Sequence, residues 1–117
     1  MYREFVVPDD QEILETIGEW PGTEEESGAR HLTLQGEENE SITFSYDALA
    51  RSVRVRWKNR SGEEIIDVFR EGATCMKVHS DKSTTHISLD FHMGECSGRM
   101  EIRLFPSFAI KDHLLFT

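Results

Sequence analysis

The sequence predicts a mainly β protein: an antiparallel sandwich or barrel-like meander of about seven strands, with one N-terminal amphipathic helix. Three observations support this fold class. Short segments alternate between apolar and polar residues, turn-forming residues separate them at intervals of roughly 8–12 residues, and a single helical pattern precedes them. A period of two sends successive side chains to opposite faces of a sheet, so each segment can bury one face. The alternative is an α+β fold in which a single curved antiparallel sheet packs on the helix.

The helix is expected over about residues 9–20. Asp9 can cap the first amides, and Glu12 follows three positions later, where a carboxylate suits the positive end of the helix dipole. Pro21 ends the pattern because its ring cannot continue a helix. The apolar side chains expected on the buried stripe are Ile13, Leu14, Ile17 and Trp20.

The alternating segments predict a β-meander over about residues 31–106. The clearest part spans residues 73–106, where three segments carry apolar residues at every second position. Pairing Phe91 with Met100 puts the apolar side chains of the last two segments on the same face of the sheet. These segments therefore predict a set of adjacent antiparallel strands.

A further hairpin is predicted earlier in the meander, around a turn at Ser61–Gly62. The proposed register matches Trp57 to Ile66. It also sets Arg56 across from Asp67, which makes a favourable pair of opposite charges.

Both ends of the chain carry apolar residues. Residues 1–7 are expected to form a short strand or an arm on the core. Residues 107–117 are too apolar for a tail, and the pattern leaves a last strand and a short helix as alternatives. We expect residues 1–117 to form a single domain, because the chain is long enough for one core and too short for two.

Charge is the most informative feature of the composition. The 117 residues hold 13 basic and 22 acidic side chains, for a net charge of −9, and residues 1–50 account for 13 of the acids but only two of the bases. Such an acidic half repels nucleic-acid phosphates and anionic membranes, and it attracts a basic protein surface. No apolar run approaches the roughly 20 residues of a membrane-spanning helix. The sequence therefore favours a basic protein partner over nucleic acid or membrane.

The two cysteines and the absence of an export signal favour the cytoplasm, where Cys75 and Cys96 are expected to be free. A bridge is left open, because both fall near the same end of the predicted sheet. His79 and His86 can be neighbours across a hairpin, which makes them weak candidates for metal ligands. Without a Cys-x-x-Cys motif or further ligands, we expect no metal and no other cofactor.

Catalytic motifs are also missing. The sequence has no Gly-x-Ser-x-Gly, no phosphate-binding glycine loop and no His-Glu-x-x-His, so no enzymatic activity is expected. One basic stripe, Arg54, Arg56 and Lys58, lies on a predicted strand. We expect the acidic half of the chain, Asp67 or a partner's carboxylates to neutralise it.

These inferences predict a non-catalytic acidic protein-binding module, an inhibitor that neutralises a basic enzyme by charge complementarity. In size, acidity and lack of catalytic motifs, the chain is comparable to toxin-neutralising immunity proteins as a class. Carboxylates on the helix and the following loop would steer the partner, and Trp20 would be the apolar anchor. The predicted partner-binding residues are Glu12, Glu15, Glu19, Trp20, Glu24, Glu25 and Glu26.

Two alternatives come from other classes of function. The β-structure could enclose a cavity for a small apolar ligand. The chain could also be a structural subunit of a homo-oligomer, because the strand at Ile65–Phe69 is apolar on both faces.

Overall fold

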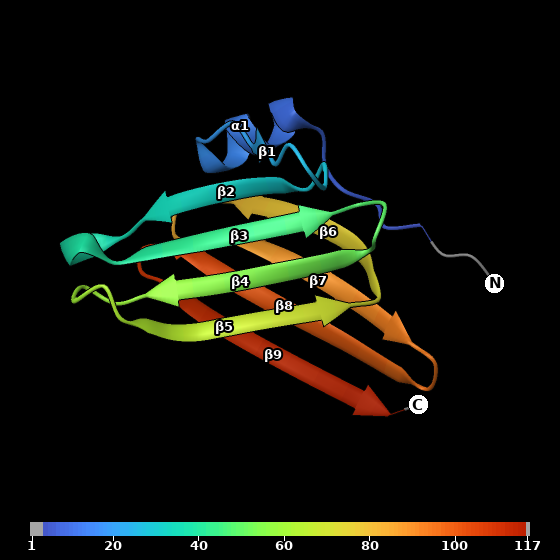
Figure 1. The fold of residues 1–117 in the computed structure, drawn as a ribbon. Coiled ribbons are helices and arrows are strands. Elements are labelled where there is room, and N and C mark those ends of the chain that lie inside the picture. The colour runs from blue at the N-terminus through green and yellow to red at the C-terminus, as the bar shows by residue number, and fades with distance from the viewer. Residues whose placement is uncertain (1–3, 117) are drawn as a thin grey trace.

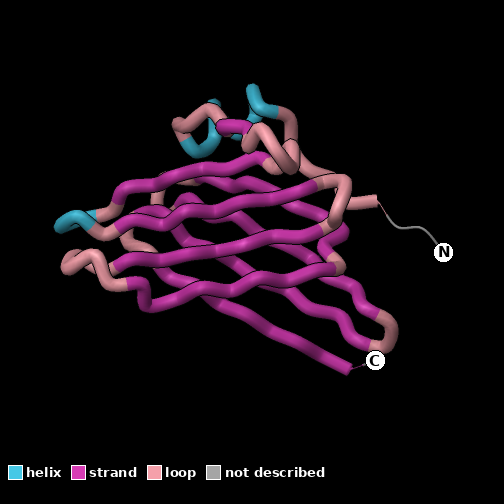
Figure 2. The backbone as a smooth tube through the Cα atoms, in the orientation of Figure 1, coloured by secondary structure: helices cyan, strands magenta, loops and turns pink. Residues whose placement is uncertain are grey.

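Two antiparallel sheets pack face to face in the computed structural model, which describes residues 4–116 (Figure 1). Consecutive strands are neighbours within each sheet, so one sheet has the order β1-β2-β3-β4-β5 and the other β6-β7-β8-β9. The strands are β1 (Gly22–Thr23), β2 (Arg30–Gln35), β3 (Ser41–Asp47), β4 (Ser52–Lys58), β5 (Glu64–Glu71), β6 (Ala73–Ser80), β7 (Thr85–Met93), β8 (Cys96–Phe105) and β9 (Ala109–Phe116). Figure 2 shows that helix is confined to the N-terminal segment and one short turn. The predicted sandwich is confirmed. The alternative of a single curved sheet is wrong, because the strands form two separate sheets.

Helix α1 spans Asp10–Ile17 and is shorter than predicted. Asp9 is the N-cap as expected, since the Glu12 amide donates to Asp9 Oδ1 at 2.8 Å. The predicted end near residue 20 is wrong. Gly18 adopts a left-handed conformation with φ of 93°, and its amide bonds to the Leu14 carbonyl, which ends the helix one turn earlier.

The early helix end changes the predicted apolar stripe. Ile13 is fully buried and Ile17 packs against the core, as the spacing predicted. Leu14 is 38% exposed, because it lies about 100° around the helix from Ile13. Trp20 lies beyond the helix and is 56% exposed, so its predicted place on the buried stripe is wrong.

The N-terminal arm and α1 cover one side of the sandwich (Figure 1). Val6 makes a parallel bridge with Cys75, in which its amide donates to the Thr74 carbonyl at 3.0 Å and its carbonyl accepts from the Met76 amide at 2.8 Å. Phe5 is buried beside it. The predicted arm is therefore confirmed for the described residues, whereas residues 1–3 lie outside them.

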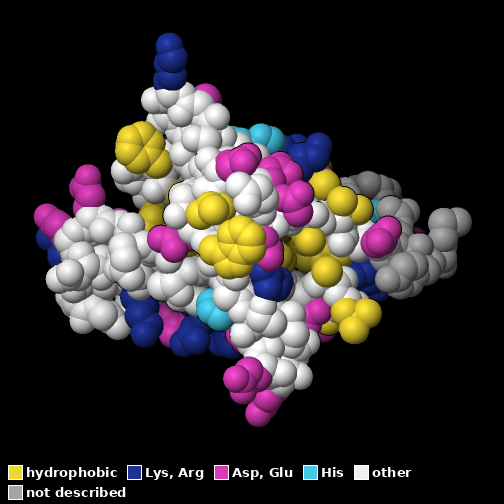
Figure 3. Space-filling view, turned by 90° about the horizontal axis from the view of Figure 1, so that it is seen from above, with side chains coloured by type: hydrophobic (Ala, Val, Ile, Leu, Met, Phe, Trp, Pro, Cys, Tyr) yellow, Lys and Arg dark blue, Asp and Glu magenta, His cyan; other side chains and the backbone are white. Residues whose placement is uncertain are grey.

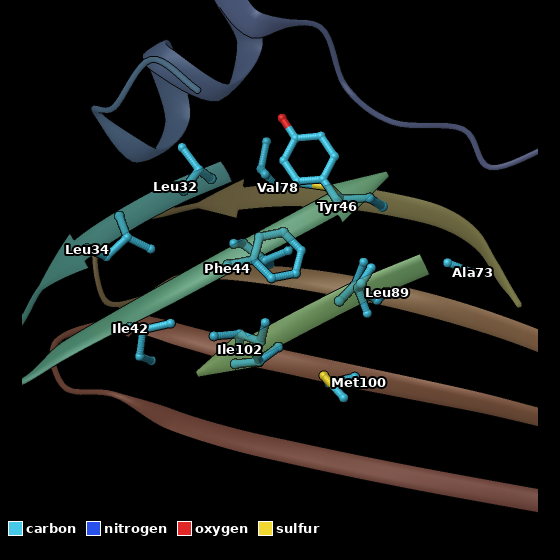
Figure 4. Packing of buried hydrophobic residues seen from close by; sticks show 14 of the residues in the cluster. Leu32, Leu34, Ile42, Phe44, Tyr46, Ala73, Val78, Leu89, Met100 and Ile102 are labelled. Carbon is cyan, nitrogen blue, oxygen red and sulfur yellow. The ribbon is translucent and has the colours of Figure 1, made fainter. Parts of the chain in front are cut away.

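The core fills the space between the two sheets (Figure 4). Ile42 and Phe44 of β3 are completely buried, as are Leu89 of β7 and Ile102 of β8. The Phe44 ring stacks on that of Tyr46, with centroids 5.6 Å apart. The alternation in the sequence identified these inward-facing positions because the side-chain period of a strand is two.

The β4–β5 register is as predicted, with Trp57 opposite Ile66 and Arg56 opposite Asp67. The predicted pairing of Phe91 with Met100 is wrong, because Met100 pairs with Leu89.

The short β7–β8 hairpin explains this difference. Met93 pairs with Cys96, which leaves a loop of only Gly94 and Glu95, and Gly94 supplies the positive φ that such a loop needs. A shift of two residues keeps every side chain on its predicted face.

The C-terminal segment forms strand β9, which settles the alternative that the sequence left open. Phe108, just before it, is buried and meets the Trp57 ring edge-on at 6.0 Å. Leu115 and Phe116, near its end, are exposed. Across residues 4–116, no helix has the length and apolar character that a membrane crossing requires.

The side of the sandwich opposite α1 is open, and β5 and β9 are its edges (Figure 1). Arg70 of β5 reaches across to Asp112 of β9, with Nη2 2.6 Å from Oδ2. The Arg70 guanidinium also lies 5.2 Å from the centre of the Phe91 ring. Within the described part of the chain, this is the ion pair that joins the two sheets.

Candidate partner-binding surface

Six predicted glutamates lie exposed at the α1 end of the molecule, and we call them the acidic surface. Its members are Glu12, Glu15, Glu19, Glu24, Glu25 and Glu26. Three belong to α1 or the residues after it, and three to the turn between β1 and β2. Figure 3 shows this end, where acidic side chains lie beside exposed hydrophobic ones.

Arg30 holds the two parts of the acidic surface together. It is the first residue of β2, and its guanidinium bonds to Asp10 of α1 and to Thr23 of β1. The turn that follows β1 is closed by its own backbone, because the Glu24 amide donates to the Ala29 carbonyl at 2.9 Å. Arg30 therefore joins α1 to the β1–β2 hairpin, and these two elements carry the exposed glutamates.

A close side-chain contact lies within that hairpin. Gly22 pairs with His31, whose imidazole lies over the glycine, and a Cβ at Gly22 would be 2.5 Å from ring atoms. A larger residue at this position would displace the His31 ring. Sequence reasoning predicted a loop here and missed both β1 and the Asp10–Arg30 pair, since no periodicity connects residues so far apart.

The charge of the acidic surface is not compensated within the described residues. Glu15 accepts a hydrogen bond from Gln11, and Glu24 one from Ser27, but none of the six glutamates forms an ion pair with a residue between 4 and 116. Like charges gathered without counter-charges project a negative potential into solvent, which attracts and orients a cationic partner.

Trp20 adds a large apolar side chain beside these acids. It directly follows Glu19, and more than half of its surface is exposed. Tryptophan side chains that become buried in a complex commonly contribute much of the binding free energy. The exposure of Trp20 contradicts its predicted place on the buried stripe of the helix. The same exposure is compatible with its predicted role as an apolar anchor.

The basic stripe has its counter-charges on the neighbouring strand. Arg54 makes two hydrogen bonds to Asp67, at 2.9 and 2.7 Å, and Arg56 makes two to Glu64, at 2.9 and 3.1 Å. The bond from Arg54 lowers the pKa of Asp67, and the bond from Arg56 lowers the pKa of Glu64. Neutralisation of the stripe by Asp67 is confirmed, but through Arg54, which lies opposite Phe69 and reaches Asp67 diagonally. The predicted ion pair between Arg56 and Asp67 is wrong, because Arg56 binds Glu64 instead.

His79 and His86 are neighbours across the β6–β7 hairpin, as predicted. Their rings stack with centroids 4.6 Å apart, and His79 Nε2 lies 3.2 Å from Ser88 Oγ. Burial lowers the pKa of His79, and the charge of His86 lowers it further. No group of three or more His, Cys, Asp or Glu side chains that could hold a metal ion occurs among the described residues.

Cys75 and Cys96 are free thiols, each half-buried. The disulfide that the sequence left open is not formed. The reason is visible in the strand pairing, where Cys75 lies opposite Asp90 and Cys96 opposite Met93.

No protein-family model and no curated protein matches this sequence. Among solved structures, the chain is similar to one from the contact-dependent growth inhibition toxin–immunity protein complex of Klebsiella pneumoniae 342. The TM-score is 0.82 at 20% sequence identity, and the match covers 98% of this chain and 100% of the other. The two chains therefore share a fold over their full lengths.

Proposed function

We propose that this chain is the immunity component of a toxin–immunity pair, a non-catalytic inhibitor that binds a basic toxin. The observation that carries the proposal is the full-length structural similarity to a chain of such a complex. Two components make up that complex, and the net charge of −9 favours the immunity component here. An acidic inhibitor is complementary to a basic enzyme, so its charge accelerates association with that enzyme.

The acidic surface is the proposed contact with the toxin. Its glutamates steer the toxin and pair with its Lys and Arg side chains. Trp20 enters the centre of the contact and loses its exposed apolar surface to the partner. Inhibition follows because the bound immunity protein covers cationic groups that the toxin needs for its own substrate.

We place this encounter in the cytoplasm. The two free thiols agree with a reducing compartment. An immunity protein there intercepts a toxin that has entered the cell.

Growth in bacteria tests the assignment. Expressed alone, this chain should leave growth unchanged. Expressed with the toxin encoded by the adjacent reading frame, it should restore growth that the toxin arrests, and the two proteins should copurify. Growth arrest by this chain alone would instead make it the toxin, and failure to protect would contradict the immunity role.

A matched pair of charge-reversed variants tests the surface. The triple variant E24K/E25K/E26K should protect less well and bind more slowly, because it replaces attraction by repulsion. The control variant E63K/D90K/E101K makes the same change in net charge in the β4–β5 turn and on β7 and β8 of the other sheet. Equal loss in both variants would show that only net charge matters and that the proposed surface is wrong.

A further inference from the structure

A groove crosses the outer face of the five-stranded sheet, next to the acidic surface. Its floor consists of short hydroxyl side chains, Thr43 and Ser45 of β3 and Ser52 of β4, and its volume is about 310 Å³. One wall is the β1–β2 turn with Glu24, and the other carries Phe69 of β5. Arg54 lies between Ser45 and Phe69, so the short residues leave room for a side chain from another molecule between the β1–β2 turn and this arginine.

The charges that line the groove do not cancel. Arg54 and Arg56 both line it, but each is held by two hydrogen bonds to a carboxylate of β5. Glu24 and Asp47 also line it, and neither forms an ion pair with a described residue. With the arginines neutralised, the groove has two uncompensated negative charges and favours a cationic guest.

Phe69, on the other wall of the groove, favours a guanidinium as the cation. The Phe69 ring is 60% exposed at the edge of the groove. A guanidinium can lie on an aromatic face while it donates hydrogen bonds to a carboxylate, and its aliphatic stem can pack on the ring edge. Serine and threonine hydroxyls on the floor can accept its remaining N–H groups.

We propose that this groove is a second contact of the same interface and receives an arginine side chain of the toxin. The inference rests on the proposed immunity function. Glu24 belongs to both the acidic surface and the groove wall, so a single partner can extend from α1 over the β1–β2 turn onto the sheet. Asp47 receives the guanidinium, and Phe69 packs against its stem. The groove thereby adds a specific pocket to a surface that otherwise attracts cations in general.

The test compares two tryptophan substitutions on the same strand and the same face. Ser45→Trp fills the groove, whereas Ser41→Trp lies four residues away on β3 and does not line it. Both serines are half-buried, and tryptophan is well accepted on a half-buried strand face. A third variant, Asp47→Asn, removes the charge but keeps the oxygen that accepts from the Ala50 amide at 3.0 Å.

Isothermal titration against toxin recovered from the copurified complex gives the dissociation constants. We expect Ser45→Trp to weaken binding by at least about 30-fold and Asp47→Asn by about fivefold to tenfold. Ser41→Trp should stay within about twofold of the wild type. If Ser45→Trp does not fold, as judged by its thermal transition, Asp47→Asn decides the question.

The possible failures are distinguishable. If the wild type binds the toxin and both Ser45→Trp and Asp47→Asn bind it equally well, the groove is not a contact. The proposed immunity function is unaffected by that result. Equal weakening by Ser41→Trp and Ser45→Trp also overturns the groove, because the effect then belongs to the whole sheet face. Absence of binding by the wild-type chain overturns both proposals.

Discussion

The ion pair between Arg70 and Asp112 is predicted to hold the open side of the sandwich closed. It joins the edge strands β5 and β9, whereas the opposite side is covered by α1 and the N-terminal arm. Removing either side chain should therefore lower the free energy of unfolding more than removing a typical surface pair. A double-mutant cycle with Arg70→Ala and Asp112→Ala isolates the interaction.

The exposure of the two side chains sets the expected size of the effect. Arg70 is 18% exposed and Asp112 36%, so the pair lies between fully solvated pairs, worth about 0.2–1 kcal/mol, and buried ones. We expect a coupling free energy of about 1 kcal/mol. Arg70→Ala alone should cost about 2 kcal/mol, because it also loses the contact with the Phe91 ring.

The assay is urea unfolding of the four proteins, followed by near-ultraviolet circular dichroism. A loss of about 1 kcal/mol corresponds to roughly 4 °C in melting temperature for a chain of this size. A coupling free energy below about 0.3 kcal/mol would refute the role of the pair in closing the sandwich.

The pH dependence of the coupling provides an independent check. The hydrogen bond from Arg70 lowers the pKa of Asp112, so the folded state favours its carboxylate. The stabilisation should be complete above the unfolded pKa of about 3.9 and should disappear as the pH falls through the lower folded pKa. Coupling that grows on acidification would contradict this assignment.

Three substitutions, two of them with a matched control, test other parts of the fold by chemical denaturation. Asp9→Ala removes the N-cap of α1 and should cost about 1 kcal/mol, while Asp9→Asn should retain most of the stability. Gly72→Ala should cost well over about 1 kcal/mol, because φ is 84° and the new Cβ would lie 2.4 Å from Met93 Cγ. Gly18→Ala is its control: φ is 93° but no atom lies within 4 Å of the new Cβ, so this change should cost only about 1 kcal/mol. Leu89→Ala, in the centre of the core, should cost about 2–5 kcal/mol, and a smaller loss would show that the two sheets can collapse around the cavity.

Alternation in the sequence was sufficient to predict the inward-facing residues. Ile87, Leu89 and Phe91 are all buried, and the β4–β5 register is correct. The β7–β8 register was wrong by two residues because alternation is unchanged by such a shift. Only the conformation of the loop at Gly94 decides between the two registers, and apolar patterns contain no information about it.

The exposed acids were also predictable, since consecutive glutamates such as Glu24–Glu26 cannot be buried together. The end of α1 was not, because Gly18 is tolerated inside some helices and terminates others. The groove could not be found from the sequence either. It exists because the β1–β2 hairpin brings Glu24 beside Asp47 and Ser45, and only the three-dimensional fold places them side by side.

The rate at which this chain associates with its toxin, measured by stopped-flow fluorescence over a range of ionic strengths, tests the central claim most directly. If the acidic surface steers the toxin, the rate should fall by at least about tenfold between low and high salt, and E24K/E25K/E26K should be slow at every salt concentration. A rate that is independent of salt, or a charge-reversed variant that associates as fast as the wild type, would contradict recognition by charge complementarity.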